Sequence, residues 1–338
     1  MKRIWRVGFG AAMAALLAMA IVAAPSGAAT GATVSAGCTP KTNIEAIIDD
    51  SGSMGFTDES RLRVQAMDLL INALPSQTQL GAVEFGSEFF EKPAADTVFP
   101  PEPVGANAVA MKSSLDTLIQ ADNGATDYNG AFAKADADNP TSQARIFLTD
   151  GGHDEGEYKE AHLAHNVPTY VVGFGSGLAA PEDQARLQKI ATDTGGQLFE
   201  LEDNSSLQAT MTKIEAALTC QTPPREFTDL LKLHQVKTHS VPVGASTKNL
   251  QIVLSWASSL DKFKLAGLRL VAKGKVLAAA RPKVRKLHVT KENGQTFLVA
   301  KVSGLRKGTL RFSVKAAKIG SGEPKVKLTT QVGRGSGK

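Results

Sequence analysis

The chain has 338 residues, of which 42% are hydrophobic and 21% are charged, and this composition excludes an intrinsically disordered polymer. Its two cysteines exclude a disulfide-dense miniprotein and a zinc site built from four thiolates. The net charge of +5 conceals an asymmetry: residues 1–220 carry 14 Lys and Arg against 28 Asp and Glu (−14), and residues 221–338 carry 24 against 5 (+19). This change of sign predicts a domain boundary near residue 220.

Residues 1–29 have the pattern of a secretory signal peptide. Three cations precede an apolar run from Val7 to Ala24, and small residues around positions 26–29 form a cleavage site. The alternative is an uncleaved membrane anchor, although the run is near the short end for crossing a bilayer. No later apolar stretch approaches about 18 residues, so we expect a secreted or cell-envelope protein without a membrane span in the mature chain.

From residue 43 to residue 219, strand patterns alternate with helical ones. The predicted strands are Asn43–Asp49, Leu80–Phe85, Arg145–Thr149, Thr169–Gly173 and Gln197–Glu200. The predicted helices are Glu59–Leu74, Asn107–Ile119 with Asn107 as its N-cap, one that follows the loop Asp122–Thr126 and ends at Ala137, Tyr158–His165, Pro181–Thr194 and Ser205–Leu218. We interpret the proline-rich residues 93–103 as a loop. Such alternation predicts an α/β domain over residues 38–220, with a doubly wound, mostly parallel sheet covered on both faces.

The pattern changes after residue 220. Residues 221–238 are expected to form a linker, residues 239–333 a basic β-sandwich, and residues 334–338 a disordered tail. The second domain is predicted from short runs rich in β-branched residues, with turn signals between them. Its strongest turn signal is Asn293-Gly294, which is typical of a tight hairpin.

The first predicted strand ends in a group of oxygen-bearing side chains. Asp49 is followed by hydroxyls at Ser51 and Ser53, and ligands of open parallel sheets bind at the carboxyl ends of the strands. Oxygen ligands of mixed charge suit a hard cation, Mg²⁺ first, with Ca²⁺ and Mn²⁺ as alternatives. Taken alone, the same residues could also form an ordinary strand-to-helix turn with hydroxyl caps.

Two later segments favour the metal site. Thr126 stands in a loop before a predicted helix, and Asp150 ends a buried strand before two glycines. The combination resembles the von Willebrand factor type A (vWA) domain, whose metal-ion-dependent adhesion site uses D-x-S-x-S, a threonine and a later aspartate. The resemblance covers about residues 42–219. It implies that Ser51, Ser53 and Thr126 bind the metal directly, while Asp49 and Asp150 bind it directly or through water.

The resemblance also implies a function. Such a site would leave a coordination position for an acidic group, so the expected partner is a protein that offers an Asp or Glu carboxylate. We therefore expect a binding or adhesion module and not an enzyme. The alternative is a regulatory or substrate-binding subunit associated with an envelope or secreted hydrolase. Asp50 is left out of the site, because adjacent residues of a strand point to opposite faces.

Three histidines are candidates for further metal ligands. His162 and His165 stand three residues apart on a predicted helix, but no Cys or Glu partner has suitable spacing for zinc, so we interpret them as a surface pair. His153 follows the Asp150 turn, and we interpret it as a solvated loop residue rather than a metal ligand.

The basic C-terminal domain has two interpretations. Cations alternate with apolar residues along two predicted strands, which would expose Arg311 and Lys315 on one and Lys325 and Lys327 on the other. They either form a solvated, solubilising sheet face or bind an anionic polymer, such as a cell-envelope polysaccharide, a teichoic-type phosphate or a nucleic acid.

The two cysteines are predicted to form a disulfide. Cys38 comes just before the first strand, and Cys220 ends the last helix, which must run back antiparallel to the strands. Both residues should therefore reach the pole of the sheet opposite the predicted metal site. Lipidation of Cys38 and two reduced thiols are the alternatives.

Overall fold

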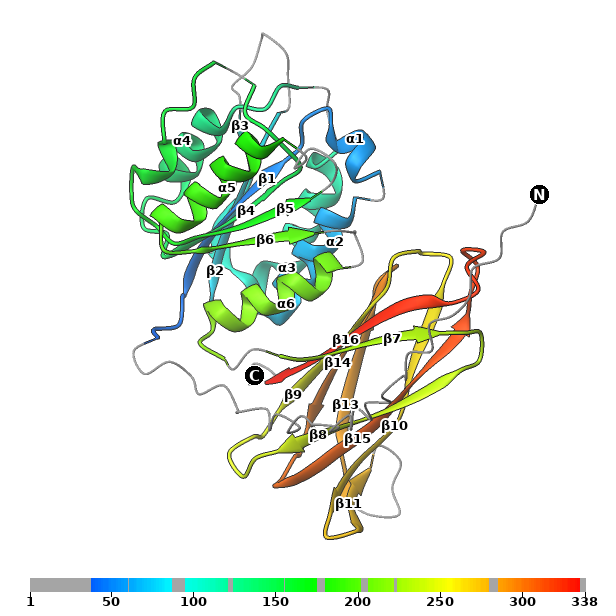
Figure 1. Ribbon diagram of the computed structural model, residues 1–338. Coiled ribbons are helices and arrows are strands. Elements are labelled where there is room, and N and C mark those ends of the chain that lie inside the picture. The colour runs from blue at the N-terminus through cyan, green and yellow to red at the C-terminus, as the bar shows by residue number, and fades with distance from the viewer. Residues whose placement is uncertain are drawn as a thin grey trace, which may run out of the picture. The chain divides into compact units, whose positions relative to one another are not determined.

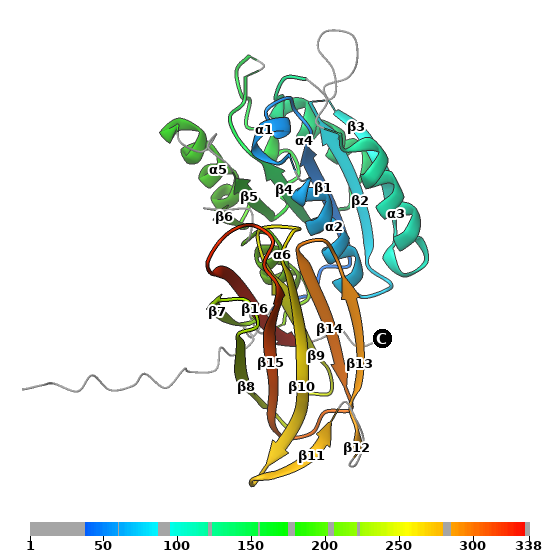
Figure 2. The same ribbon diagram turned by 90° about the vertical axis from the view of Figure 1, so that its right-hand side faces the viewer.

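A computed structural model of the chain describes residues 38–59, 61–86, 95–120, 124–154, 156–174, 180–201, 206–221, 224–279 and 285–334. The predicted signal peptide lies outside these residues, and so do residues 335–338 of the predicted tail. Arg334, which was expected to begin that tail, is the last residue of a strand. Figures 1 and 2 show the helices and strands in two views.

The N-terminal domain is built on a six-stranded sheet in the order β3-β2-β1-β4-β5-β6. Its strands are β1 (Asn43–Asp49), β2 (Gln79–Phe85), β3 (Ala95–Pro103), β4 (Ala144–Thr149), β5 (Thr169–Phe174) and β6 (Gln197–Leu201). All neighbours are parallel except β2 and β3. The strand order reverses between β1 and β4, which in doubly wound folds is where ligands bind, and the predicted fold class is confirmed.

Helices cover both faces of this sheet (Figure 1). They are α1 (Met54–Thr57), α2 (Leu62–Ala73), α3 (Val104–Leu118), α4 (Tyr128–Asp138), α5 (Pro181–Asp193) and α6 (Leu207–Leu218). Successive side chains of a strand point to opposite faces. Ile48 therefore packs in one core with residues of α2, α3 and α6, while Ile47 packs in another with residues of α4 and α5. Burial on both faces explains the nearly continuous apolar run of β1.

One predicted loop is a strand. Residues 95–103 form β3, which pairs antiparallel with β2 and is the edge of the sheet. Proline cannot donate a ladder hydrogen bond, and an edge strand leaves one side of its backbone unpaired, so prolines are accepted there. The prolines led to the prediction of a loop, although they argue only against a central strand and not against an edge strand.

Two predicted helices differ in detail. α3 begins at Val104, so Asn107 is not its N-cap but a first-turn residue whose amide donates to the Pro103 carbonyl at 3.0 Å. Within the predicted helix Tyr158–His165, only Ala161–Leu163 forms a 3₁₀ turn. Glu160 has a φ of 51°, a left-handed conformation that a right-handed helix excludes, so the chain is not helical before Ala161.

The C-terminal domain consists of two five-stranded sheets. One, here the β15 sheet, has the order β12-β11-β10-β15-β8, and the other, the β16 sheet, has the order β13-β14-β9-β16-β7. The strands are β7 (Arg225–Leu231), β8 (Val236–Val243), β9 (Leu250–Ser255), β10 (Lys262–Ala272), β11 (Lys275–Ala279), β12 (Arg285–Lys286), β13 (His288–Asn293), β14 (Phe297–Ser303), β15 (Gly308–Lys318) and β16 (Val326–Arg334). One apolar cluster contains buried residues of both sheets, among them Ile252 and Phe312.

Strand β7 lies within the residues predicted as linker. It pairs with β16 from Arg225 to Leu231, and β8 also begins before residue 239. The predicted hairpin at Asn293-Gly294 joins β13 to β14. A second hairpin joins β10 to β11, where Lys273 and Gly274 both have positive φ, as a type I′ turn requires.

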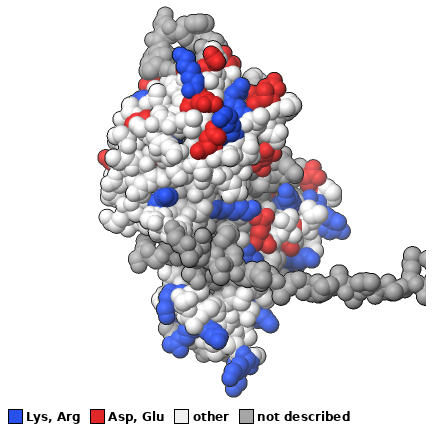
Figure 3. Space-filling model, turned by 60° about the vertical axis from the view of Figure 1, so that its left-hand side comes forward, with Lys and Arg blue, Asp and Glu red and all other residues white. Residues whose placement is uncertain are grey.

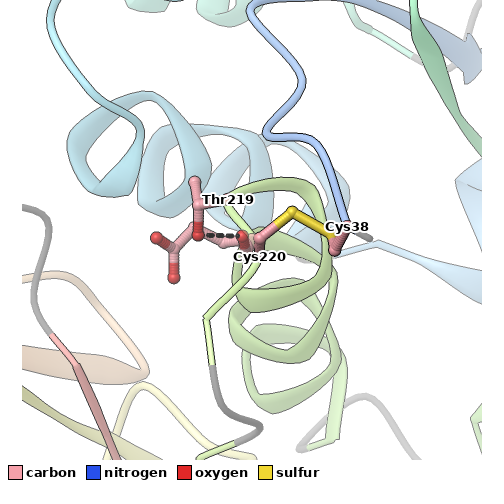
Figure 4. Close-up of a disulfide and its surroundings, with 4 residues drawn as sticks. Cys38, Thr219 and Cys220 are labelled. Carbon is pink, nitrogen blue, oxygen red and sulfur yellow. Dashed lines mark hydrogen bonds between the residues drawn. A yellow bond between two sulfur atoms is a disulfide. The ribbon is translucent and has the colours of Figure 1, made fainter. Parts of the chain in front are cut away.

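The predicted disulfide joins Cys38 to Cys220, with the two Cα atoms 5.8 Å apart. Figure 4 shows the bridge between the segment before β1 and the end of α6. Nearby, the backbone N–H of Lys41 donates to the Leu218 carbonyl at 2.8 Å, so the two segments are also joined by the backbone. The bridge precedes the amino end of β1, whereas Asp49 ends that strand.

Removal of the disulfide should lower the stability of the fold. The bridge spans 182 residues of sequence, and for such a loop the chain-entropy model gives about 5 kcal/mol as an upper value. We expect the Cys38→Ser/Cys220→Ser variant to unfold at lower urea concentration than the wild type. Intact mass of the exported protein should show a two-proton deficit and no alkylation before reduction. A diacylglyceryl mass or two reactive thiols would contradict the bridge.

Glu45 is a buried acid at the centre of the sheet. Its Oε2 accepts a hydrogen bond from Asn139 at 3.0 Å, while Oε1 has no partner among the described residues. Its neighbour on β2 is Gly81, where a Cβ atom would collide with the carboxylate. Burial raises the pKa of Glu45 from 4.5 to about 8, so at neutral pH the folded protein keeps this side chain protonated.

The Glu45→Gln variant should therefore change how stability depends on pH. Between pH 4.5 and about 8 the unfolded chain releases the proton and the folded chain retains it, so this residue lowers stability as pH rises. The slope is at most about 1.4 kcal/mol per pH unit. Urea unfolding at pH 5.5 and 8 should show a smaller loss for Glu45→Gln than for the wild type. Glu102→Gln, at an exposed site on β3, is the control and should behave as the wild type does.

Candidate functional site

The candidate site lies where β1 and β4 end. These strands are parallel neighbours, with Ile48 opposite Leu148, so Asp49 and Asp150 come to the same edge of the sheet. Both carboxylates are buried, and so is Ser51, whereas Ser53 is exposed. The site therefore reaches the surface through the second serine of the motif.

Four of the five predicted ligands have neighbouring side-chain oxygens. The Ser51 hydroxyl donates to Asp49 Oδ1 at 2.6 Å, and the hydroxyls of Ser51 and Ser53 are 3.1 Å apart. The Ser53 hydroxyl donates to Asp150 Oδ1 at 3.0 Å. Residues almost 100 positions apart in sequence thus place their oxygen atoms in one continuous group, as the motif predicts.

The fifth predicted ligand, Thr126, is buried in the loop before α4. This loop contacts both others: Gly52 N–H donates to the Gly124 carbonyl at 3.1 Å, and Thr126 N–H donates to Asp154 Oδ1 at 2.6 Å. Among the hydrogen bonds of the described residues, none joins the Thr126 hydroxyl to the other four ligands. The position of Thr126 is therefore fixed by hydrogen bonds of the loop backbone and not by its hydroxyl.

Further residues hold the two carboxylates and were not predicted. Thr149 donates to Asp49 Oδ2 at 2.7 Å, and the Tyr128 hydroxyl lies 3.0 Å from the Thr149 hydroxyl. Thr57 of α1 donates to Asp150 Oδ2 at 2.6 Å. Each carboxylate thus accepts hydrogen bonds at both oxygens. Thr149 could have been noticed, because it directly precedes Asp150, but Tyr128 and Thr57 carry no signal in the sequence.

His153 was predicted to be a solvated loop residue, and this interpretation is wrong. Its side chain is 1% exposed, and Nδ1 accepts a hydrogen bond from Tyr128 N–H at 3.1 Å. The ring also packs against the rings of Tyr128 and Tyr158. His153 and Asp154 together bind the loop after Asp150 to the loop that carries Thr126. The predicted surface pair is likewise corrected at His162, which is buried and bonded to Tyr158.

The burial of two neighbouring acids determines the electrostatics of the site. Burial, followed by the charge of Asp150, raises the pKa of Asp49 to about 7. Burial also raises the pKa of Asp150, against the hydrogen bonds from Thr57 and Ser53. A cation between the carboxylates would relieve this cost. Two carboxylates and neutral hydroxyls are a donor set that fits Mg²⁺ or Ca²⁺, and the residues present therefore fit a hard divalent ion.

Asp50 turns away from this group, as predicted. Its carboxylate forms an ion pair with Arg63 and accepts a hydrogen bond from Gln120 N–H at 2.8 Å. Arg63 also pairs with Asp58 at 3.0 Å, and all three side chains are buried. This triad joins the motif to α2 and to the end of α3.

Breaking the triad should strongly destabilise the domain. Arg63→Met leaves the carboxylates of Asp50 and Asp58 buried without their cation, which typically costs about 3–5 kcal/mol. We expect a matching loss in the free energy of unfolding by urea. The triple variant with Asp50→Asn and Asp58→Asn should recover much of the loss, because it buries no uncompensated charge. A loss below about 1 kcal/mol for Arg63→Met alone would contradict the assignment.

The four predicted anion-binding cations are divided between two sheets. Arg311 and Lys315 lie on β15, and Lys327 lies on β16 with Lys325 just before it. The predicted alternation is confirmed, since the apolar neighbours of these cations are buried. The four residues do not form one patch, however, because β15 and β16 belong to different sheets.

The described residues contain no cluster of three or more His, Cys, Asp or Glu side chains that could hold a metal, so the candidate donor set depends on its hydroxyls. None of the described helices has the length and apolar character needed to cross a membrane.

The model of the von Willebrand factor type A domain family matches residues 43–213, half of the chain. Among solved structures, the chain is similar to a von Willebrand factor type A protein from Catenulispora acidiphila, with 16% identity and a TM-score of 0.43 over 86% of this chain and 62% of that one. It is also similar to proximal thread matrix protein 1 from the mussel byssus, solved with a zinc-occupied MIDAS motif. The identity is 18% and the TM-score 0.44, over 57% of this chain and 50% of that one. A third similar structure is the pilus adhesin SpaC from Lactobacillus rhamnosus GG, with 10% identity and a TM-score of 0.42 over 87% of this chain and 44% of that one.

The chain thus spans less than two thirds of each of these three structures. A search of curated proteins found no match.

Proposed function

Because the chain belongs to the von Willebrand factor type A family, we propose that it is an exported binding protein that captures an acidic side chain of a protein partner at a divalent cation. The proposed ligands are Asp49, Ser51, Ser53, Thr126 and Asp150. A bound Mg²⁺, or Ca²⁺ or Mn²⁺ in its place, would supply an electrophilic position for the partner's carboxylate. Binding without turnover is the proposed activity.

The observation that carries this proposal is the pair of buried carboxylates that two serines connect. The carboxylates carry at most two negative charges, and the hydroxyls add none, so a divalent ion would be neutralised and not over-compensated. Such an ion keeps its attraction for a further anion. Ser53 is the exposed member of this group, so a ligand would approach from its side.

An exposed aromatic residue next to the site supports a protein partner. Phe56 of α1 is 85% exposed and stands three residues after Ser53. Aromatic side chains are enriched in protein–protein interfaces relative to the rest of the surface. We therefore propose that the partner presents an apolar side chain close to its Asp or Glu.

Secretion is supported by the disulfide. Bridges such as Cys38–Cys220 form and persist in oxidising compartments and are rare in the cytosol. The signal-peptide pattern at residues 1–29 agrees with this and predicts the route of export.

Thermal unfolding with Mg²⁺ tests the metal site. A ligand that binds only the folded state stabilises it by about 2.7 kcal/mol at a hundredfold excess over its Kd. We expect millimolar Mg²⁺ to raise the melting midpoint of the wild type and EDTA to reverse the increase. Asp150→Asn should abolish the response, whereas Asp116→Asn, at an exposed site on α3, should retain it. Identical midpoints with Mg²⁺ and with EDTA would contradict the proposal.

A capture experiment tests the partner. The wild-type chain, Asp150→Asn and Asp116→Asn are each immobilised and exposed to extracts of surface proteins with Mg²⁺ or EDTA. A partner should be retained by the wild type and Asp116→Asn in Mg²⁺ only, and blocking its carboxyl groups with a carbodiimide and an amine should prevent capture. Capture that EDTA and Asp150→Asn leave unchanged would show that the acidic ligand is not held at this site.

A further inference from the structure

Pairs of cations face one another across the centre of the β15 sheet. Strands β10 and β15 are antiparallel, and their register places a cation opposite a cation at three positions. These pairs are Lys262 with Lys318, Lys264 with Lys315, and Arg269 with Arg311. We call these six residues the cation ladder. Their strand neighbours, such as Phe263 and Phe312, are buried in the sandwich, so the ladder lies on the outer face of the sheet.

No acid of this domain balances the ladder. Like charges directly opposite one another destabilise an antiparallel pair. Among the hydrogen bonds and ion pairs of the described residues, none involves a side chain of the ladder. The five acids of residues 221–338 lie elsewhere: Glu226 and Asp229 on β7, Asp261 buried in a turn, Glu292 on β13 and Glu323 in a loop. On the side of the molecule drawn in Figure 3, Lys and Arg side chains also stand without acidic neighbours at the lower end.

The repeat of the ladder indicates the shape of its ligand. Alternate residues of a strand are about 6.8 Å apart along the sheet, and opposed residues are about 5 Å apart across it. Along β10, Lys262 and Lys264 are one such step apart, while a register shift puts their partners Lys318 and Lys315 three residues apart on β15. A row with Ala266 and Ser313, followed by a second register shift, separates these pairs from the Arg269 pair. A small anion could contact one row only. A linear chain with regularly repeated charges could follow all three.

The side chains of this face favour a phosphate polymer without bases over a nucleic acid. Arg269 and Arg311 offer planar forks of donors that match phosphate oxygens, and the hydroxyls of Ser313 and Thr238 lie beside them on the sheet. Binding of single-stranded nucleic acid uses aromatic side chains on which bases stack. The outward positions of β8, β10 and β15 hold no aromatic residue. We propose that the cation ladder binds a linear polymer of phosphodiester-linked units that carries no bases.

Linear inorganic polyphosphate is the probe, and single-stranded DNA with the same number of phosphates is the comparison. Binding of each to the full chain is measured in EDTA over a series of salt concentrations. We expect polyphosphate to bind at low salt, with an affinity that falls linearly with salt on logarithmic axes. DNA should bind no more tightly, because the face gives its bases nothing to stack on.

Two double variants remove equal charge from the two sheets. Arg311→Ser/Lys315→Ser removes two cations of the ladder, whereas Lys325→Ser/Lys327→Ser removes two from the other sheet or its edge. The first should reduce the slope of the salt dependence by about 1.4, at roughly 0.7 for each lost phosphate contact. The second should leave the slope close to that of the wild type. Equal melting midpoints for both variants and the wild type verify that the fold is intact.

Three outcomes would overturn the inference. Absence of polyphosphate binding at low salt would leave the ladder as a solvated face. Equal losses for the two variants would show that net charge alone attracts the probe, and tighter binding of DNA would indicate a nucleic-acid surface. Because EDTA is present throughout, these results are independent of whether the type A domain binds a metal ion or an acidic partner.

Discussion

The juxtaposition of two buried carboxylates is the constraint on which the candidate site depends. Asp49 and Asp150 end neighbouring parallel strands, so the strand register itself places them together. Burial and the charge of Asp150 raise the pKa of Asp49 to about 7, which shows how costly the pair is without a counterion. The hydroxyls of Ser51 and Ser53 lie between the acids and offer neutral oxygens. The cost of the pair and its proposed affinity for a cation therefore have the same origin.

The surrounding hydrogen bonds hold the loops that carry these groups. Thr149 fixes one carboxylate and Thr57 the other, so neither can turn freely. His153 and Asp154 extend from the Asp150 loop to the backbone of residues 126–128. Three loops from different parts of the chain are thereby joined into one framework. The disulfide joins the chain at the other end of β1, where it constrains the segments that enter and leave the domain.

The two sheets of the C-terminal domain divide its positive charge in a way that net charge does not reveal. Both sheets bury one face in a shared core, so the cations of each strand can point outward only. On the β15 sheet the register of β10 and β15 brings like charges into direct opposition. The arrangement is therefore a property of the strand pairing and not of composition.

The sequence by itself determined the local features. Apolar runs and turn residues located β1, β2, β4, β5 and β6, and the spacing Asp49-x-Ser51-x-Ser53 indicated the site, because these signals depend only on nearby residues. Tertiary structure alone decided the features that depend on distant partners. Strand β3 contains prolines that only an edge position accepts, and the left-handed conformation of Glu160 interrupts the helix predicted there. His153 is buried because the loop of Tyr128 folds over it, and the ladder exists because β10 pairs with β15. No pattern within a segment records which other segment will pack against it.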